Sequence, residues 1–106
     1  MYLIATRSFP PELGGMQSLM WGLAKELSKN FMIKVFADYH KDHKEFDQAV
    51  NFSIERVGGI KFLRKIRKAQ LVNEFLKENK VQGIIADHWK SLELIKTEKK
   101  KYCLVH

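Results

Sequence analysis

The loop that decides the fold reads Ser8-Phe9-Pro10-Pro11-Glu12-Leu13-Gly14-Gly15-Met16-Gln17, and it separates an apolar run from an amphipathic segment at residues 16–27. This order predicts a strand, a rigid loop, a pair of glycines and then a helix. The two prolines fix φ and remove two backbone donors, whereas the two glycines allow a sharp turn and a close approach to a ligand. A helix that begins here presents unpaired N–H groups and the positive end of its dipole, which suits an anion such as phosphate.

The length and composition predict one folded domain. A chain of 106 residues can bury one hydrophobic core but not two, and a hydrophobic content of 45% argues against disorder. No apolar run reaches the length of a membrane span, and residues 1–4 do not resemble a signal peptide. The single cysteine, Cys103, is expected to be a buried, inert thiol. These features favour the cytoplasm. The net charge of +7 predicts attraction to anionic membranes, nucleic acids or phosphorylated ligands, without choosing among them.

Hydrophobic periodicity predicts strands and helices in alternation. The expected strands cover residues 2–6, 31–37, 51–57, 81–86 and 102–105; the expected helices cover residues 16–27, 60–79 and, as a short helix, 89–95. Residues 40–48 form a charged connector with some helical potential. Six apolar side chains of the helix at residues 60–79 are expected to face the core: Phe62, Ile66, Ala69, Val72, Phe75 and Leu76. The alternation implies an α/β fold, a Rossmann-like three-layer sandwich with a mostly parallel sheet and right-handed crossovers.

Polar residues and glycines collect where the expected strands end. The first strand leads to Arg7 and the glycine pair, the fourth ends at Asp87 and His88, and the fifth ends at His106. Ligands of open parallel sheets bind at the carboxyl ends of the strands, near the point where the strand order reverses. Because strands one and four are neighbours in the usual doubly wound order, we expect these residues to share one rim of the sheet.

The first loop and the helix after it resemble the start of family 4 glycosyltransferases. The resemblance is carried by three sequence motifs, in this order: Phe9-Pro10-Pro11, Gly14-Gly15-Met16-Gln17 and Leu23-Ala24-Lys25-Glu26-Leu27. The resemblance continues through Ile84-Ile85-Ala86-Asp87-His88-Trp89 to Leu104-Val105-His106, and it covers the chain as the first half or so of an N-terminal domain. It implies one half of a two-domain GT-B architecture, in a retaining enzyme that uses a nucleotide-sugar donor. Asp87 departs from the pattern, because many relatives carry an apolar residue or a histidine there.

The resemblance also implies a role for each matching residue. The backbone of Gly14 and Gly15 would lie beside the donor pyrophosphate or the transferred sugar, and His106 would act over that sugar as the catalytic residue. Four further residues would contact the acceptor: Arg7, Gln17, Asp87 and His88. Retaining transfer in this fold is described as front-face attack, in which the leaving phosphate helps to deprotonate the acceptor. The protein then contributes positioning and charge stabilisation, and neither a metal nor another cofactor is required.

An essential part of the enzyme would lie elsewhere. In this family the C-terminal domain holds the nucleotide through a basic pair and two spaced glutamates, and this sequence does not supply that pattern. We therefore expect residues 1–106 to be a fragment of the acceptor-side domain that does not turn over alone. Its expected partners are the nucleotide-sugar donor, a glycan or lipid-linked acceptor such as a glycolipid or lipopolysaccharide precursor, and the missing domain, but no nucleic acid.

Five cations crowd the first turns of the second long helix: Lys61, Arg64, Lys65, Arg67 and Lys68. They are interleaved with apolar residues and lie where cations oppose the helix dipole. A basic and partly apolar helix can lie on an anionic bilayer, and similar helices in lipid-modifying relatives dock on membranes. We therefore expect a membrane-binding helix and a peripheral location at the inner face of the membrane. An ordinary solvated face is the alternative.

Two other functions stay open. Asp38 ends the second expected strand, roughly where the ribose-binding acid of a dinucleotide-binding Rossmann domain belongs, although Gly-x-Gly-x-x-Gly is absent. A non-enzymatic basic binding module would use the positive charge, although the sequence lacks zinc-ligand spacing and a helix-turn-helix. His40 and His43 lie in a charged loop without a cysteine partner, so we expect them to be solvated and expect no metal site.

Overall fold

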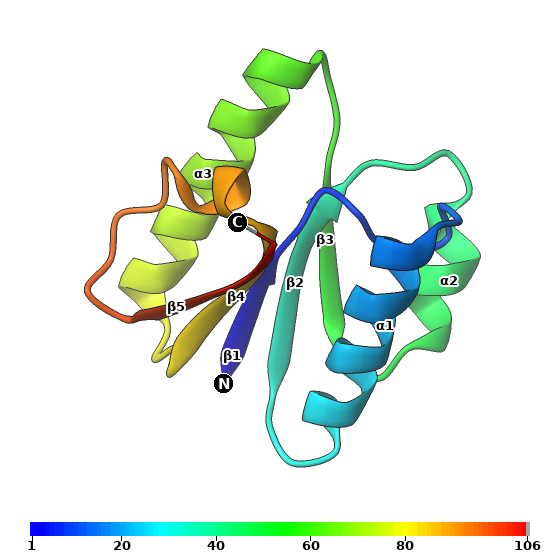
Figure 1. Cartoon of the computed structure of the whole chain (residues 1–106), viewed down its shortest axis with the longest axis horizontal. Helices are drawn as coiled ribbons and strands as arrows, with labels where there is room; N and C mark the ends of the chain where they lie inside the picture. Colours follow the sequence, from blue (N-terminus) through cyan, green and yellow to red (C-terminus); the bar gives the residue numbers. More distant parts are fainter. Residues whose placement is uncertain (106) are drawn as a thin grey trace.

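The computed structural model describes residues 1–105, and at its centre is an all-parallel sheet with the strand order β3-β2-β1-β4-β5 (Figure 1). The strands are β1 (Tyr2–Ala5), β2 (Ile33–Asp38), β3 (Ser53–Val57), β4 (Gly83–His88) and β5 (Lys100–Val105). The helices are α1 (Gly15–Ser28), α2 (His43–Ala49), α3 (Lys61–Glu78) and the short 3₁₀ helix η1 (Trp89–Leu92). The expected fold class, a Rossmann-like three-layer α/β sandwich, is thereby confirmed.

Two hydrophobic cores lie on opposite faces of the sheet. Helices α1 and α2 cover one face, and α3 and η1 cover the other (Figure 1). Leu3 and Ile4 are neighbours in β1 and both are fully buried, but they pack in different cores because successive side chains of a strand point to opposite faces. Met20 of α1 packs in the core of Ile4, and Val72 of α3 packs in that of Leu3. The continuous apolar run in β1 therefore follows from burial on both faces.

The strand order reverses between β1 and β4. Ile4 is paired with Val35 of β2 on one side and with Ile85 of β4 on the other. From β1 the chain proceeds through β2 to β3, and then α3 carries it back across the sheet to β4. The expected neighbourhood of strands one and four is therefore confirmed, and the carboxyl edge beside it is where ligands bind in open sheets of this kind.

Several local predictions differ from the structure. The charged connector contains a true helix, α2, and β4 continues through Asp87 and His88, beyond the expected end of that strand. The inward placement of Phe62 is wrong: its side chain is 70% exposed, because the first turn of α3 extends beyond the edge of the sheet (Figure 1). Cys103 is half-buried rather than buried, since it lies on an edge strand that is covered less completely.

Candidate functional site

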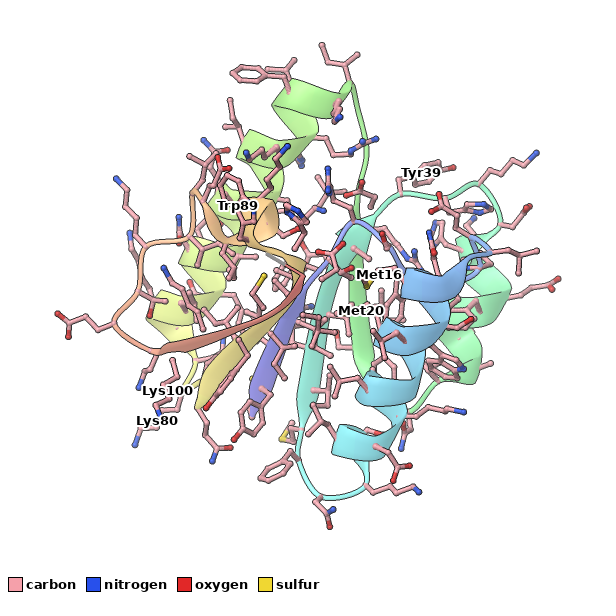
Figure 2. All side chains as sticks on the ribbon, in the orientation of Figure 1. Met16, Met20, Tyr39, Lys80, Trp89 and Lys100 are labelled. Atoms are coloured by element: carbon pink, nitrogen blue, oxygen red, sulfur yellow. The ribbon has the colours of Figure 1, made fainter. Side chains whose placement is uncertain are left out.

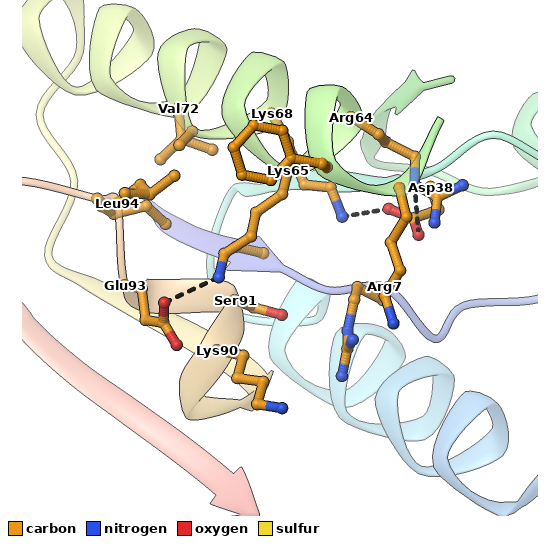
Figure 3. A pocket seen from close by; sticks show the side chains of 15 residues that line it. Arg7, Asp38, Arg64, Lys65, Lys68, Val72, Lys90, Ser91, Glu93 and Leu94 are labelled. Atoms are coloured by element: carbon orange, nitrogen blue, oxygen red, sulfur yellow. Dashed lines mark hydrogen bonds and ion pairs between the residues drawn. The ribbon is translucent and has the colours of Figure 1, made fainter. Parts of the chain in front are cut away.

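A cavity of about 380 Å³ opens at the carboxyl edge of the sheet, between α3 and the segment that follows β4 (Figure 3). Six cationic side chains line it: Arg7, Lys61, Arg64, Lys65, Lys68 and Lys90. Two carboxylates, Asp38 and Glu93, also line it. We call this cavity the basic pocket. Its lining carries more positive than negative charge, so it is suited to an anion.

Three of the six cations are held by ion pairs inside the pocket. Asp38 at the end of β2 is paired with Lys68 Nζ through one oxygen and with Arg64 Nε, at 3.2 Å, through the other. Lys65 Nζ lies 2.8 Å from Glu93 Oε2 (Figure 3). Lys68 is buried, and its ammonium also donates to the carbonyl of Thr6 at 3.0 Å. Burial lowers the pKa of Lys68, and the negative charge of Asp38 opposes that shift.

The other three cations are not committed to the protein. Within residues 1–105, the side chains of Arg7, Lys61 and Lys90 make no hydrogen bond or ion pair, and no dashed line reaches Arg7 or Lys90 in Figure 3. Arg7 follows β1, Lys90 lies in η1 and Lys61 begins α3, so three separate elements bring them to one cavity. An incoming anion would find these charges available without breaking an internal contact.

Asp87 fixes the backbone on which Arg7 is carried. This carboxylate is only 2% exposed, and it accepts hydrogen bonds from the N–H of Arg7 at 3.1 Å, from its neighbour His88 at 2.9 Å and from the hydroxyl of Ser91 at 2.8 Å. Both of its oxygens are therefore occupied by protein donors. Asp87 therefore holds the end of β1 and the start of η1 together.

The glycine turn lies on the other side of the same edge. Gly14 precedes α1 with φ of 157° and ψ of 168°, a region that only glycine occupies readily, and a Cβ there would collide with the side chain of Gln17. The side-chain amide of Gln17 donates a hydrogen bond to the carboxylate of Glu12. Helix α1 has no side-chain cap and no acidic residue in its first turn, so no side chain caps its first N–H groups. Gly14, Gly15 and Gln17 do not line the basic pocket.

His88, one of the two predicted histidines, does not line the basic pocket. His88 lies at the end of β4, where its Nδ1 accepts from the N–H of Lys90 at 3.2 Å and its ring lies beside Trp89 with centroids 5.7 Å apart. This contact begins η1. His106, the expected catalytic residue, lies outside the described residues.

The basic helix is not a uniform surface. Lys68 is wrong as a membrane-contacting residue, because it is buried against Asp38, whereas Arg67 is exposed. Three large apolar side chains are exposed at the start of α3: Ile60, which precedes the helix, and Phe62 and Leu63 in its first turn. Among the residues that the structure describes, no helix is both long and apolar enough to cross a membrane.

The structure also bears on the competing readings of the sequence. Asp38 is paired with Lys68 and Arg64 on the α3 side of the sheet, so its carboxylate is turned away from the glycine turn that a dinucleotide would need. His43 lies 3.0 Å from Asp47, and residues 1–105 contain no group of three or more side chains that could hold a metal ion.

Sequence reasoning missed three residues of the basic pocket: Lys90, Ser91 and Glu93. The rule that ligands bind after the carboxyl ends of strands would have pointed to them, because they follow β4 directly. Arg7 was found by that rule, and the cations of α3 were found by their charge, but not as neighbours of Arg7. Comparison of the sequence with models of protein families and with curated proteins finds no match.

Proposed function

We propose that this chain is the acceptor-side domain of a retaining glycosyltransferase that transfers a sugar from a nucleotide-sugar donor. The observation that carries the proposal is the uncapped start of α1, which lies at the carboxyl edge of the sheet after a Pro-Pro and Gly-Gly loop. The neighbouring pair β1 and β4 forms the strand-order reversal at that edge. In open α/β sheets this is the position of a phosphate-bearing ligand.

The glycine turn supplies the chemistry that a diphosphate leaving group requires. Gly14 and Gly15 put no side chain between the backbone and a ligand, and α1 contributes the positive end of its dipole. Charge that develops on the departing diphosphate would be stabilised by donors that are already in position. The C1–oxygen bond to the diphosphate breaks as the acceptor oxygen bonds to C1 on the same face, and the acceptor proton passes to the leaving phosphate oxygen.

The remaining roles follow from position along the chain. His106 would orient the transferred sugar or the acceptor, and Arg7 would contact the acceptor. His88 and Gln17 keep their proposed acceptor roles, whereas Asp87 acts by holding the Arg7 backbone. The nucleotide would be held by a separate C-terminal domain, so we expect residues 1–106 alone to bind but not to turn over.

We further propose that the acceptor is lipid-linked and reached at an anionic membrane face. The exposed Ile60, Phe62 and Leu63 would enter the headgroup region, and Lys61 and Arg67 would meet anionic lipid. Co-sedimentation with vesicles of phosphatidylcholine and phosphatidylglycerol at low salt tests this. Binding that persists after Phe62→Ser and Leu63→Ser together contradicts it.

The glycosyltransferase proposal is tested on the native polypeptide. An antibody raised against this chain would identify it in its source cells, and we expect a mass well above the 12.4 kDa of these 106 residues. The purified native protein would then be assayed for release of nucleoside diphosphate from a panel of nucleotide sugars. Gly14→Ala should abolish most of that release, whereas Gly22→Ala, whose Cβ meets nothing within 4 Å, should not. A native mass of 12.4 kDa, or equal activity in both variants, contradicts the proposal.

The basic pocket favours one second candidate, a non-enzymatic module that binds an anionic partner. Such a module would bind with a steep dependence on salt and would be indifferent to nucleotide sugars. A titration at two salt concentrations, with and without nucleotide sugar, separates the two functions.

A further inference from the structure

We infer that the basic pocket binds the phosphate monoester of a small hydroxylated molecule, such as a sugar phosphate or a polyol phosphate. This site is separate from the glycine turn of α1, whose residues do not line it. The inference therefore goes beyond the proposed function, and only the identification of this ligand as the acceptor would rest on that function.

Charge is the first argument. The pocket is lined by six cationic side chains and two carboxylates, so an excess of four positive charges remains. Internal pairing occupies Lys65, Lys68 and Arg64, and leaves Arg7 and Lys90 at the opening without a partner among residues 1–105. Like charges that line one cavity repel one another, and a bound dianion would relieve the repulsion.

The start of α3 is the second argument. Its first turn contains no acidic residue and no side-chain cap, and Lys61 and Arg64 lie there instead. Cations at a helix N-terminus oppose the dipole and weaken an isolated helix. An anion in the basic pocket would be attracted both by the helix dipole and by Lys61, the cation of this turn that has no partner among residues 1–105.

Rigidity is the third argument. Asp38 holds Lys68 and Arg64, Glu93 holds Lys65, and Asp87 holds the backbone of Arg7. The paired part of the lining is thus fixed before a ligand arrives, so the conformational entropy lost on binding is confined mainly to the side chains of the unpaired cations.

The volume of the basic pocket and its apolar lining indicate which kind of molecule bears the phosphate. A volume of about 380 Å³ is near the lower end of ligand pockets, which suits one sugar ring with its phosphate. The lining also includes four apolar side chains against which the carbon face of a sugar or polyol can pack: Ala69, Val72, Leu94 and Ile95. A phosphomonoester carries close to two negative charges above about pH 6, and it would lie at the opening near Arg7 and Lys90.

The test uses the 106-residue chain and isothermal titration with glucose 6-phosphate as the probe. Arg7→Gln with Lys90→Gln removes two uncommitted, exposed cations of the pocket. Lys80→Gln with Lys100→Gln is the matched control: these cations are also exposed, and they lie at the far edge of the sheet (Figure 2). Circular dichroism establishes that both double variants are folded. Each pocket cation should contribute about tenfold in affinity.

We expect a loss of about 100-fold in the Arg7 and Lys90 variant, a change within about twofold in the control, and no binding of unphosphorylated glucose. The phosphomonoester can come from a free metabolite or from a lipid. Vesicles that carry phosphatidic acid, compared with vesicles of phosphatidylglycerol at equal surface charge, separate the sources. Preference for phosphatidic acid that depends on Arg7 and Lys90 assigns the lipid source.

Two results would overturn the inference that the basic pocket binds a phosphomonoester. The inference is overturned if neither glucose 6-phosphate nor phosphatidic acid binds, or if the pocket variant and the control lose the same affinity. Because no nucleotide sugar is present in these titrations, their outcome is independent of whether the chain belongs to a glycosyltransferase.

Discussion

The two faces of the sheet end differently at the same carboxyl edge. On the α1 face, Phe9 fills the space after β1 and contacts the rings of Trp21, Phe46 and Phe52, with centroids 6.0–6.5 Å away. Beside them Arg56 is paired with Asp47 at 2.7 Å and also donates to two backbone carbonyls. On the α3 face the edge is hollow and lined by cations, of which three have no partner among the described residues.

The difference teaches where binding energy is available. An arginine with a buried side chain whose three guanidinium nitrogens all donate to the protein, such as Arg56, contributes to the fold rather than to ligand binding. An exposed cation in a preformed cavity, such as Lys90, contributes little to the stability of the fold and is available to bind a ligand. At this edge the start of α1 offers backbone N–H donors without a side-chain cap, whereas the α3 face offers side-chain charge.

The largest change in the free energy of unfolding should come from truncating a buried side chain on the α1 face. Phe9→Ala removes a residue that is 2% exposed and whose ring contacts three other aromatic rings, so it should reduce the free energy of unfolding by about 3–5 kcal/mol. Phe62→Ala, at a ring 70% exposed on the other face, should change it by less than about 0.5 kcal/mol. Urea denaturation of both variants is the measurement. Similar losses would mean that the two faces are packed alike.

Arg56→Met tests the same contrast through charge. It leaves Asp47 without its closest partner in a half-buried site, and we expect a loss of about 3 kcal/mol in the free energy of unfolding. Arg67→Met removes an exposed arginine of α3 and should cost less than about 0.5 kcal/mol. The two urea midpoints should therefore separate clearly, and coinciding midpoints would refute the assignment of Arg56 to the fold.

The glycines of α1 sharpen the comparison at the turn itself. Gly14→Ala puts a side chain in a glycine-only conformation and against Gln17, which should cost about 1–3 kcal/mol. Gly22→Ala adds a methyl group to open space in mid-helix and should stabilise the protein by about 1 kcal/mol. Thermal unfolding should shift in opposite directions, and a shift in the same direction would argue against a strained turn.

The smallest effect concerns pH and the open face. Because burial lowers the pKa of Lys68 below its usual 10.5, the unfolded chain binds more protons than the folded chain as the pH approaches that value. The stability of the parent relative to Lys68→Met should therefore rise between pH 7 and pH 10.5. Lys80→Met, at an exposed lysine, should show no such trend. Urea denaturation across this pH range measures the difference in the free energy of unfolding between the parent and Lys68→Met. A difference that falls with pH would contradict the burial of Lys68.

Much of the candidate site was within reach of the sequence, although its grouping was not. Arg7 and the cations of α3 were recognised separately, the first by its place after a strand and the others by their number. Their meeting in one cavity depends on the return of α3 across the sheet, which brings Lys68 to Asp38, thirty residues earlier in the chain. Phe62 fits the helical period of the core, but the helix begins beyond the sheet and leaves this residue 70% exposed.

The order of strands and helices, the parallel sheet and the turn before α1 were determined by the sequence alone, because periodicity, glycine and proline act within a few residues. Only the tertiary structure decided which charges are neutralised. Lys68 and Lys90 are both lysines near polar neighbours in the sequence, yet one is buried in an ion pair and the other is available at a cavity. An ion pair depends on a distance of a few ångströms between side chains, and in this protein that distance is set by elements that are far apart along the chain.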